Sequence, residues 1–202
     1  MSGTFPTSPG FADIKIVSWQ PTLVSLSHSL QRQVRSRGGA QRWAIEATYP
    51  PNLRRAELAP IFAFAVAQRG QYGKFTLQLP DLWANARGAA TGTPVVYGAG
   101  QTGRTVLTAG WTPNTTAILL LGDLIKFAGH DKVYMVTAST SSDASGRAYV
   151  AIEPALLSSP ANNAAVSVSN ISFVVSFSSD VQEVFIRGAN RHEYKVSFVE
   201  IV

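Results

Sequence analysis

Cysteine is absent from this sequence, and charge is scarce. Its 202 residues include no cysteine, and Asp, Glu, Lys and Arg together make up only 14% of them. The lack of thiols excludes disulfides, thiolate catalysis and thiolate metal sites, so stability has to come from packing. With 46% hydrophobic residues, the low charge predicts a globular protein whose surface largely meets other protein.

Long apolar runs are missing as well. No stretch approaches the ~20 apolar residues of a membrane-spanning helix, and the N-terminus lacks the charged region and apolar core of a signal peptide. We therefore expect a soluble, unprocessed chain with no membrane partner.

Positive charge is present but local. The formal net charge is +5, and residues 28–90 hold nine Arg or Lys against three Asp or Glu. The excess lies around 31–37 and at Arg54-Arg55. No aromatic residues interleave with it, which favours a solvated or subunit-facing strand edge. A track for nucleic-acid phosphates is the alternative.

The apolar pattern predicts a mainly β protein with one helix, a β-sandwich or barrel plus helix. Residues 11–19 and 75–79 alternate as strands. The polar run 28–37 ends at Gly38-Gly39 and predicts a hairpin with 41–49. The helix ends near Gly70, and Pro60 predicts that it begins near Glu57 or, if kinked, at Asn52.

Composition changes predict two domains. Ala, Gly and Thr dominate 84–93, and Ser, Pro and Asn dominate 158–163. Between these boundaries the chain has short β-rich runs, which predict a small OB-like barrel or, as an alternative, a small sandwich. The runs are 94–97, 105–109, 117–121, 124–127, 132–137 and 149–152. Later strands at 169–178 and 191–202, joined by 181–190, most simply complete the first sheet. We expect one domain of 1–90 with 166–202, and an inserted domain of 91–165.

A glycine-rich motif invites a nucleotide-binding interpretation. Gly98, Gly100 and Gly103 satisfy G-x-G-x-x-G, and Asp123 lies where a ribose-binding acid would be expected. The same run nearly matches the phosphate loop G-x-x-x-x-G-K-[ST], with Arg104 in place of its lysine. Both motifs need a following helix, whereas 105–113 is β-branched and ends in Gly and Pro. The sequence favours a hairpin loop, with Asp123 in a turn; a nucleotide-using enzyme is the alternative.

The remaining chemistry-bearing residues are isolated. His28, His130 and His192 lie in three segments without ligand spacing, so we expect surface or turn histidines, no metal site, no cofactor and no catalytic residues. Tyr97, Trp111 and Tyr134, with Phe127, are a candidate face on which a base or sugar could stack. The alternative is that they fill the core of a small, charge-neutral barrel.

Several segments have to be considered together: Trp43-Ala44-Ile45 to Tyr49-Pro50, Glu57-Leu58, 62–70, 75–80, 122–134 and Ile152-Glu153-Pro154-Ala155-Leu156. Together they resemble the distal tail protein family of long-tailed bacteriophages, in the form with an inserted OB-like domain. These motifs are structural and extend over most of 11–202.

The resemblance implies a structural virion protein rather than an enzyme, made in the host cytoplasm and located at the tail tip. It implies a homo-oligomeric ring, a hexamer, that joins the tail tube protein to the tail hub protein, with the tape-measure protein as a possible further partner. DNA would meet the ring only in transit through its channel. Arg32, Arg35 and Arg37 are then candidate residues of a subunit interface. The alternative function is a module that binds carbohydrate or single-stranded nucleic acid through the inserted barrel.

Overall fold

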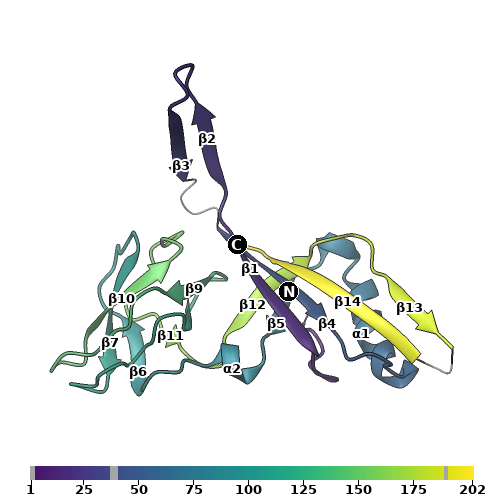
Figure 1. The fold of residues 1–202 in the computed structure, drawn as a ribbon. Coiled ribbons are helices and arrows are strands. Elements are labelled where there is room, and N and C mark those ends of the chain that lie inside the picture. Colours follow the sequence, from purple (N-terminus) through teal and green to yellow (C-terminus); the bar gives the residue numbers. More distant parts are fainter. Residues whose placement is uncertain (1–2, 37–40, 189–190) are drawn as a thin grey trace. The chain divides into compact units, whose positions relative to one another are not determined.

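The chain forms two compact units that consist mainly of β-strands (Figure 1). The computed structural model describes residues 3–36, 41–188 and 191–202. Unit 1 is formed within 1–20, 42–78 and 173–202, and unit 2 within 21–41 and 79–172. The predicted mainly β class is confirmed. The predicted domains, 1–90 with 166–202 and 91–165, stay a prediction, because compactness does not test which segments fold on their own.

Unit 1 contains one sheet in the strand order β1-β4-β14-β12-β5. Strand β13 pairs with the first residues of β14, from Arg191 to Tyr194. Buried and exposed residues alternate along β4 and β14, which places one side of each strand in the core. The strands are β1 (Asp13–Trp19), β4 (Arg42–Thr48), β5 (Phe75–Gln78), β12 (Ser172–Phe177), β13 (Val184–Arg187) and β14 (Arg191–Glu200). The late strands β12 and β14 therefore share a sheet with β1, β4 and β5.

Helix α1 (Arg55–Ala67) belongs to unit 1 and buries Leu58, Ile61 and Ala65. It begins two residues before the predicted start near Glu57 and three residues after the alternative start at Asn52. The backbone of Arg54 is extended, and its N–H donates to the Glu57 carboxylate at 2.8 Å. This capping contact makes Arg55 the first residue of the helix. Pro60 therefore lies in the second turn. There it removes one helical hydrogen bond without ending the helix.

The predicted hairpin between 28–37 and 41–49 is wrong. Strand β3 (Arg32–Ser36) pairs with β2 (Thr22–Leu26), whereas β4 pairs with β1 and β14. The β2–β3 pair is a separate two-stranded sheet. The turn predicted at Gly38-Gly39 lies outside the described residues.

Unit 2 contains a nearly closed barrel-like sheet of six strands, ordered β11-β8-β9-β10-β7-β6. The two ends approach each other through a bridge between Val95 and Ala165 and a hydrogen bond from the Val96 N–H to the Ala164 carbonyl. The strands are β6 (Gly92–Val96), β7 (Thr105–Trp111), β8 (Leu124–Phe127), β9 (Val133–Val136), β10 (Ala148–Glu153) and β11 (Val166–Ser167). An OB-fold has five strands, so this barrel has one more.

The predicted strand at 117–121 is not formed. Leu119 makes only an isolated bridge to Thr140, and Ile118 and Leu119 are fully buried. The short helix α2 (Asp81–Ala84) lies before the barrel. A 3-10 turn, η1 (Gly70–Tyr72), lies before β5. Across the described ranges, no helix is both long and apolar enough to cross a membrane.

Two stacked tyrosines in unit 1 predict a sensitivity of the fold to high pH. The rings of Tyr49 and Tyr194 lie 5.9 Å apart between centroids, and both side chains are buried. Burial raises the pKa of Tyr194 to about 12, and burial together with the neighbouring Tyr194 raises the pKa of Tyr49 well above its usual range. The folded state therefore keeps protons that the unfolded chain loses above about pH 10.

We expect the free energy of unfolding to fall as pH rises from 10 to 12, by roughly 1.4 kcal/mol per pH unit for each tyrosine. Urea titrations at pH 8, 10 and 11.5 measure this loss. Tyr49→Phe should make it shallower, and should cost little at pH 8, because the Tyr49 hydroxyl has no hydrogen-bond partner among the described residues. The exposed Tyr72 provides the control Tyr72→Phe. Equal slopes for the two variants would contradict the prediction.

Candidate functional sites

The β2–β3 hairpin exposes every residue of both strands. Val24 pairs with Val34 and Leu26 with Arg32, so these four side chains share one face, and Leu23 and Arg35 share the other. The exposed apolar residues of the hairpin are Leu23, Val24, Leu26, Leu30 and Val34. An isolated two-stranded hairpin is marginally stable in water, so this apolar surface is suited to a partner.

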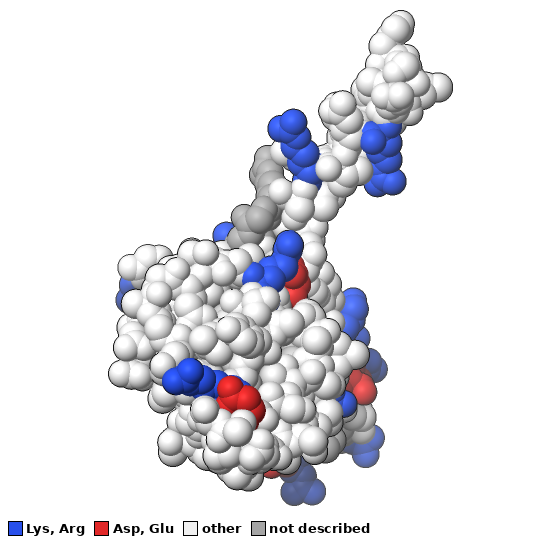
Figure 2. Space-filling view, turned by 90° about the vertical axis from the view of Figure 1, so that its left-hand side faces the viewer, with Lys and Arg blue, Asp and Glu red and all other residues white. Residues whose placement is uncertain are grey.

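Two of the three predicted interface arginines can be placed. Arg32 and Arg35 lie on β3 and point to opposite faces, because their positions differ by an odd number. Arg37 lies outside the described residues. On the face shown in Figure 2, basic side chains are scattered and some lie beside acidic side chains, so they do not join into a continuous track. That spacing favours protein contacts over a phosphate track on this face.

A second exposed apolar surface lies in unit 1. Strand β13 pairs only with β14 among the described strands, and its Phe185 and Ile186 are exposed. Beside it, α1 and the β13–β14 hairpin border a groove of about 650 Å³. The groove is lined by Arg55, Leu58, Ala59, Phe62, Ala63, Val184, Ile186, Arg187 and His192. The β13 edge and this groove together are called the β13 surface below.

The glycine-rich motif forms the loop between β6 and β7. The Gln101 side chain fixes this loop, because its amide donates to the carbonyls of Tyr97 and Leu107 and accepts from the Leu107 N–H at 2.6 Å. The segment that follows is strand β7, so the loop lacks the helix N-terminus that both phosphate-binding motifs require. The motif therefore closes a hairpin, as the sequence favoured.

The three aromatic residues of the predicted binding face do not share one face. Trp111 and Tyr134 are buried in the barrel core, where the Trp111 indole donates to Thr108 at 2.8 Å. Tyr97 is exposed instead, and the Arg147 guanidinium lies 4.2 Å from its ring centroid. Trp111 and Tyr134 thus follow the alternative interpretation, in which they fill the barrel.

The histidines lie in three separate places. His28 is exposed in the turn of the β2–β3 hairpin, and His130 follows β8 with its ring 3.4 Å from the Ser158 hydroxyl. Partial burial lowers the pKa of His130 below its ordinary value. His192 differs from the expected surface position, because it lies in β14 and is buried. Among the described residues, no three His, Asp or Glu side chains lie close enough together to hold a metal ion.

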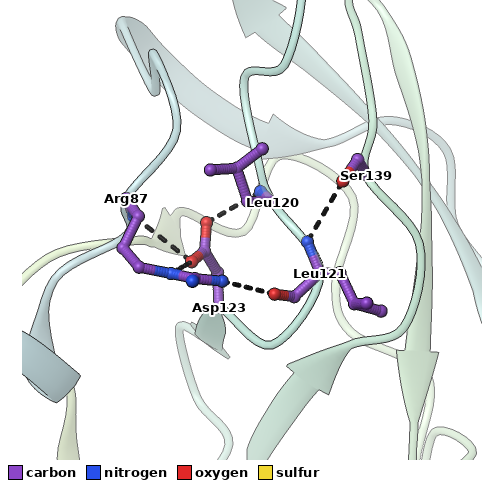
Figure 3. Close-up of polar contacts among 5 residues, drawn as sticks. All are labelled: Arg87, Leu120, Leu121, Asp123 and Ser139. Atoms are coloured by element: carbon purple, nitrogen blue, oxygen red, sulfur yellow. Dashed lines mark hydrogen bonds and ion pairs between the residues drawn. The ribbon is translucent and has the colours of Figure 1, made fainter.

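Asp123 is the central acceptor of a polar arrangement in unit 2 (Figure 3). Its side chain is 1% exposed, and it accepts from the Arg87 Nε at 3.0 Å and from the Leu120 N–H at 2.8 Å. The backbone N–H of Arg87 also donates to it, and the Arg87 guanidinium donates in turn to the Leu121 carbonyl. The Leu121 N–H donates to Ser139. Asp123 thus stabilises a turn, as predicted, and it also forms an ion pair with Arg87.

A cleft of about 450 Å³ lies beside this ion pair. Its lining combines exposed apolar side chains with the fixed polar groups: Trp83, Asn85, Arg87, Leu121, Gly122, Asp123, Leu124 and Met135. Trp83 and Arg87 cannot be identified as site residues from the sequence, because the lining is spread from 83 to 135 and has no motif. The one available signal was a tryptophan in an otherwise polar and small-residue segment.

Replacing Asp123 with alanine should destabilise unit 2 by about 2–3 kcal/mol, because two partly buried N–H groups and the Arg87 guanidinium would lose their buried acceptor. The exposed Asp131 gives the matched control Asp131→Ala, which should stay within ~0.5 kcal/mol of the unchanged chain. Urea unfolding followed by the tryptophan fluorescence of the chain, to which the buried Trp111 of unit 2 contributes, measures both values. A loss below ~0.5 kcal/mol for Asp123→Ala would show that this bonding contributes little.

Comparison with known proteins gives one family. Residues 84–171 match the family model described as distal tail protein pb9, B domain. The matched segment contains the barrel from β6 to β11 and is less than half of the chain. No curated protein matches the chain. The predicted resemblance to the distal tail proteins of siphophages is confirmed for this segment. It supports a structural role in a phage tail, located in the virion, and favours a structural protein over an enzyme.

Proposed function

We propose that this chain, whose residues 84–171 match a distal tail protein domain, is a structural protein at the tail tip of a long-tailed bacteriophage. Copies of it form a ring, a hexamer, that connects the tail tube to the tail hub and surrounds the channel for DNA. The tape-measure protein is a further candidate partner. The family match is the observation that carries this proposal.

A cyclic ring requires two different surfaces on each subunit, because the contact is heterologous. The chain offers two such surfaces. One is the apolar hairpin with Leu26 and Val34, and the other is the β13 surface with Phe185 and Ile186. Both expose apolar side chains, and β13 also has an edge available for pairing. We therefore propose that the β2–β3 hairpin of one subunit binds the β13 surface of the next subunit in the ring.

Charge near the start of β13 complements the hairpin arginines, whereas Arg55 and Arg187 in the groove lining do not. Arg32 and Arg35 are exposed on the hairpin, and the exposed carboxylates of Asp180 and Glu183 lie just before β13. Opposite charges around an apolar contact set its register and exclude wrong partners more than they add affinity. The arginines are thus residues that orient the contact, and the apolar side chains supply most of its free energy.

Sedimentation velocity of the purified chain, with negative-stain electron microscopy of the same sample, tests the ring. The expected result is a closed ring many times heavier than the 21.6 kDa subunit, either alone or after addition of the tail tube protein. Replacing Arg32, Arg35 and Arg37 together with serine should weaken assembly. A monomer under both conditions would overturn the ring, and unchanged assembly of the triple variant would overturn the role of the arginines.

A further inference from the structure

We propose that the cleft of unit 2 lined by Trp83, Arg87, Leu121 and Asp123 binds an uncharged saccharide. This binding site is distinct from the two surfaces assigned to ring contacts and does not depend on ring formation. All of its lining residues come from unit 2. Trp83 lies just outside the segment that matches the distal tail protein domain.

The apolar part of the cleft suits the C–H face of a sugar ring. Trp83 on the short helix α2 is 50% exposed, although tryptophan is among the residues that gain most from burial. Leu121 is also exposed, and Met135 contributes a partly exposed, adaptable side chain on β9. An exposed indole beside a cleft provides a flat apolar surface that a pyranose ring can cover.

The polar part of the cleft is ordered before any ligand arrives. Arg87 uses its Nε for Asp123 and one Nη2 N–H for the Leu121 carbonyl, and a guanidinium has five N–H donors in total. The other donors are therefore held in fixed directions and can bond to hydroxyl oxygens. A side chain that is already ordered loses less entropy on binding, which favours affinity for a small ligand.

Charge and size select the class of ligand. Asp123 neutralises Arg87, so the cleft carries no net positive charge from this pair and does not favour a phosphate over a neutral group. Its volume of about 450 Å³ falls within the ~300–1,000 Å³ usual for small-molecule sites. Two or three sugar rings with their hydroxyls match an apolar wall and a fixed set of donors. Single-stranded nucleic acid fits less well, because stacking would lack the basic groove that accompanies it.

The test uses the full chain on an array of neutral oligosaccharides built from glucose, galactose, mannose and N-acetylglucosamine. An oligo-dT strand and inorganic phosphate are added as comparison probes in solution. We expect binding to at least one neutral saccharide, and Trp83→Ala should weaken it at least tenfold. Arg87→Lys, which keeps the charge but loses the fork of donors, should weaken it as well. Tyr149→Ala removes another exposed aromatic residue of unit 2 and should leave binding unchanged.

Three outcomes would overturn the proposal. These are no binding to any neutral saccharide, binding that Trp83→Ala leaves unchanged, and binding to oligo-dT or phosphate alone. Thermal unfolding of each variant checks that the barrel stays folded. If Trp83→Ala unfolds it, Leu121→Ala, which removes the other exposed apolar side chain of the cleft, replaces it and should also weaken binding. Sedimentation of the same variants should show unchanged assembly, so failure of this site and failure of the ring are distinguishable.

Discussion

Serine at Val24, Leu26 and Val34 should leave the protein monomeric at concentrations where the unchanged chain forms rings. These side chains share one face of the β2–β3 hairpin and are exposed in the single chain. Their loss should raise the dissociation constant of the subunit contact at least a hundredfold, which corresponds to about 2.7 kcal/mol. Because they are not part of either core, the melting temperature of the units should change little. Sedimentation velocity over a range of concentrations measures the effect.

A matched variant on the other proposed surface makes this test specific. Ile186→Asp places a charge on the exposed side of β13 and should also prevent ring formation. Each variant keeps one intact surface, so an equimolar mixture of the two should form a heterodimer and no ring. A mixture that contains only monomers would contradict the proposed contact between the hairpin and the β13 surface. Rings formed by either variant alone would contradict it as well.

Phe5→Ala should cost unit 1 about 3–5 kcal/mol of its free energy of unfolding. Phe5 is 1% exposed, and its ring centroid lies 5.0–6.4 Å from those of five other phenylalanines. These are Phe11, Phe64, Phe75, Phe177 and Phe198. The segment before β1 is held in place by this ring and by the hydrogen bond from the Phe5 N–H to the Thr76 carbonyl. Removing the ring leaves a cavity at the centre of an aromatic cluster.

Urea unfolding of the monomeric hairpin variant measures this cost without interference from assembly. Phe185→Ala is the matched control, because the same truncation at an exposed position creates no cavity. It should change the free energy of unfolding by less than ~0.5 kcal/mol. Similar losses for Phe5→Ala and Phe185→Ala would show that the N-terminal segment does not organise the core of unit 1.

Strands with one buried face could be predicted from the sequence, whereas the pairing partners of exposed strands could not. Trp43 and Ile45 alternate with less apolar residues and revealed β4, because a half-buried strand has a period of two. Strand β3 is exposed on both faces, so its pattern carried no information on its partner, and sequence proximity suggested β4 instead of β2. Strand β13 is also mostly exposed, and the sequence predicts only a connection at 181–190.

A polar site could be predicted only where neighbouring residues in the sequence determine it. The Gly98–Gly103 loop could be assigned from sequence, because a phosphate site would need a helix that 105–113 cannot form. The Trp83–Asp123 cleft could not, since its residues meet only when the barrel brings α2 beside the turn before β8. Leu30, with φ of 61°, turns the β2–β3 hairpin without any glycine, so this turn gave no signal either.

Immunogold labelling of intact phage particles with antibodies against this chain tests the central proposal most directly. Antibodies raised against the 84–171 segment should place gold at the distal end of the tail, one cluster per particle. The same antibodies should not label the capsid or the length of the tail tube. Particles that carry no label, while the chain is found free in the lysate, would contradict a structural role at the tail tip.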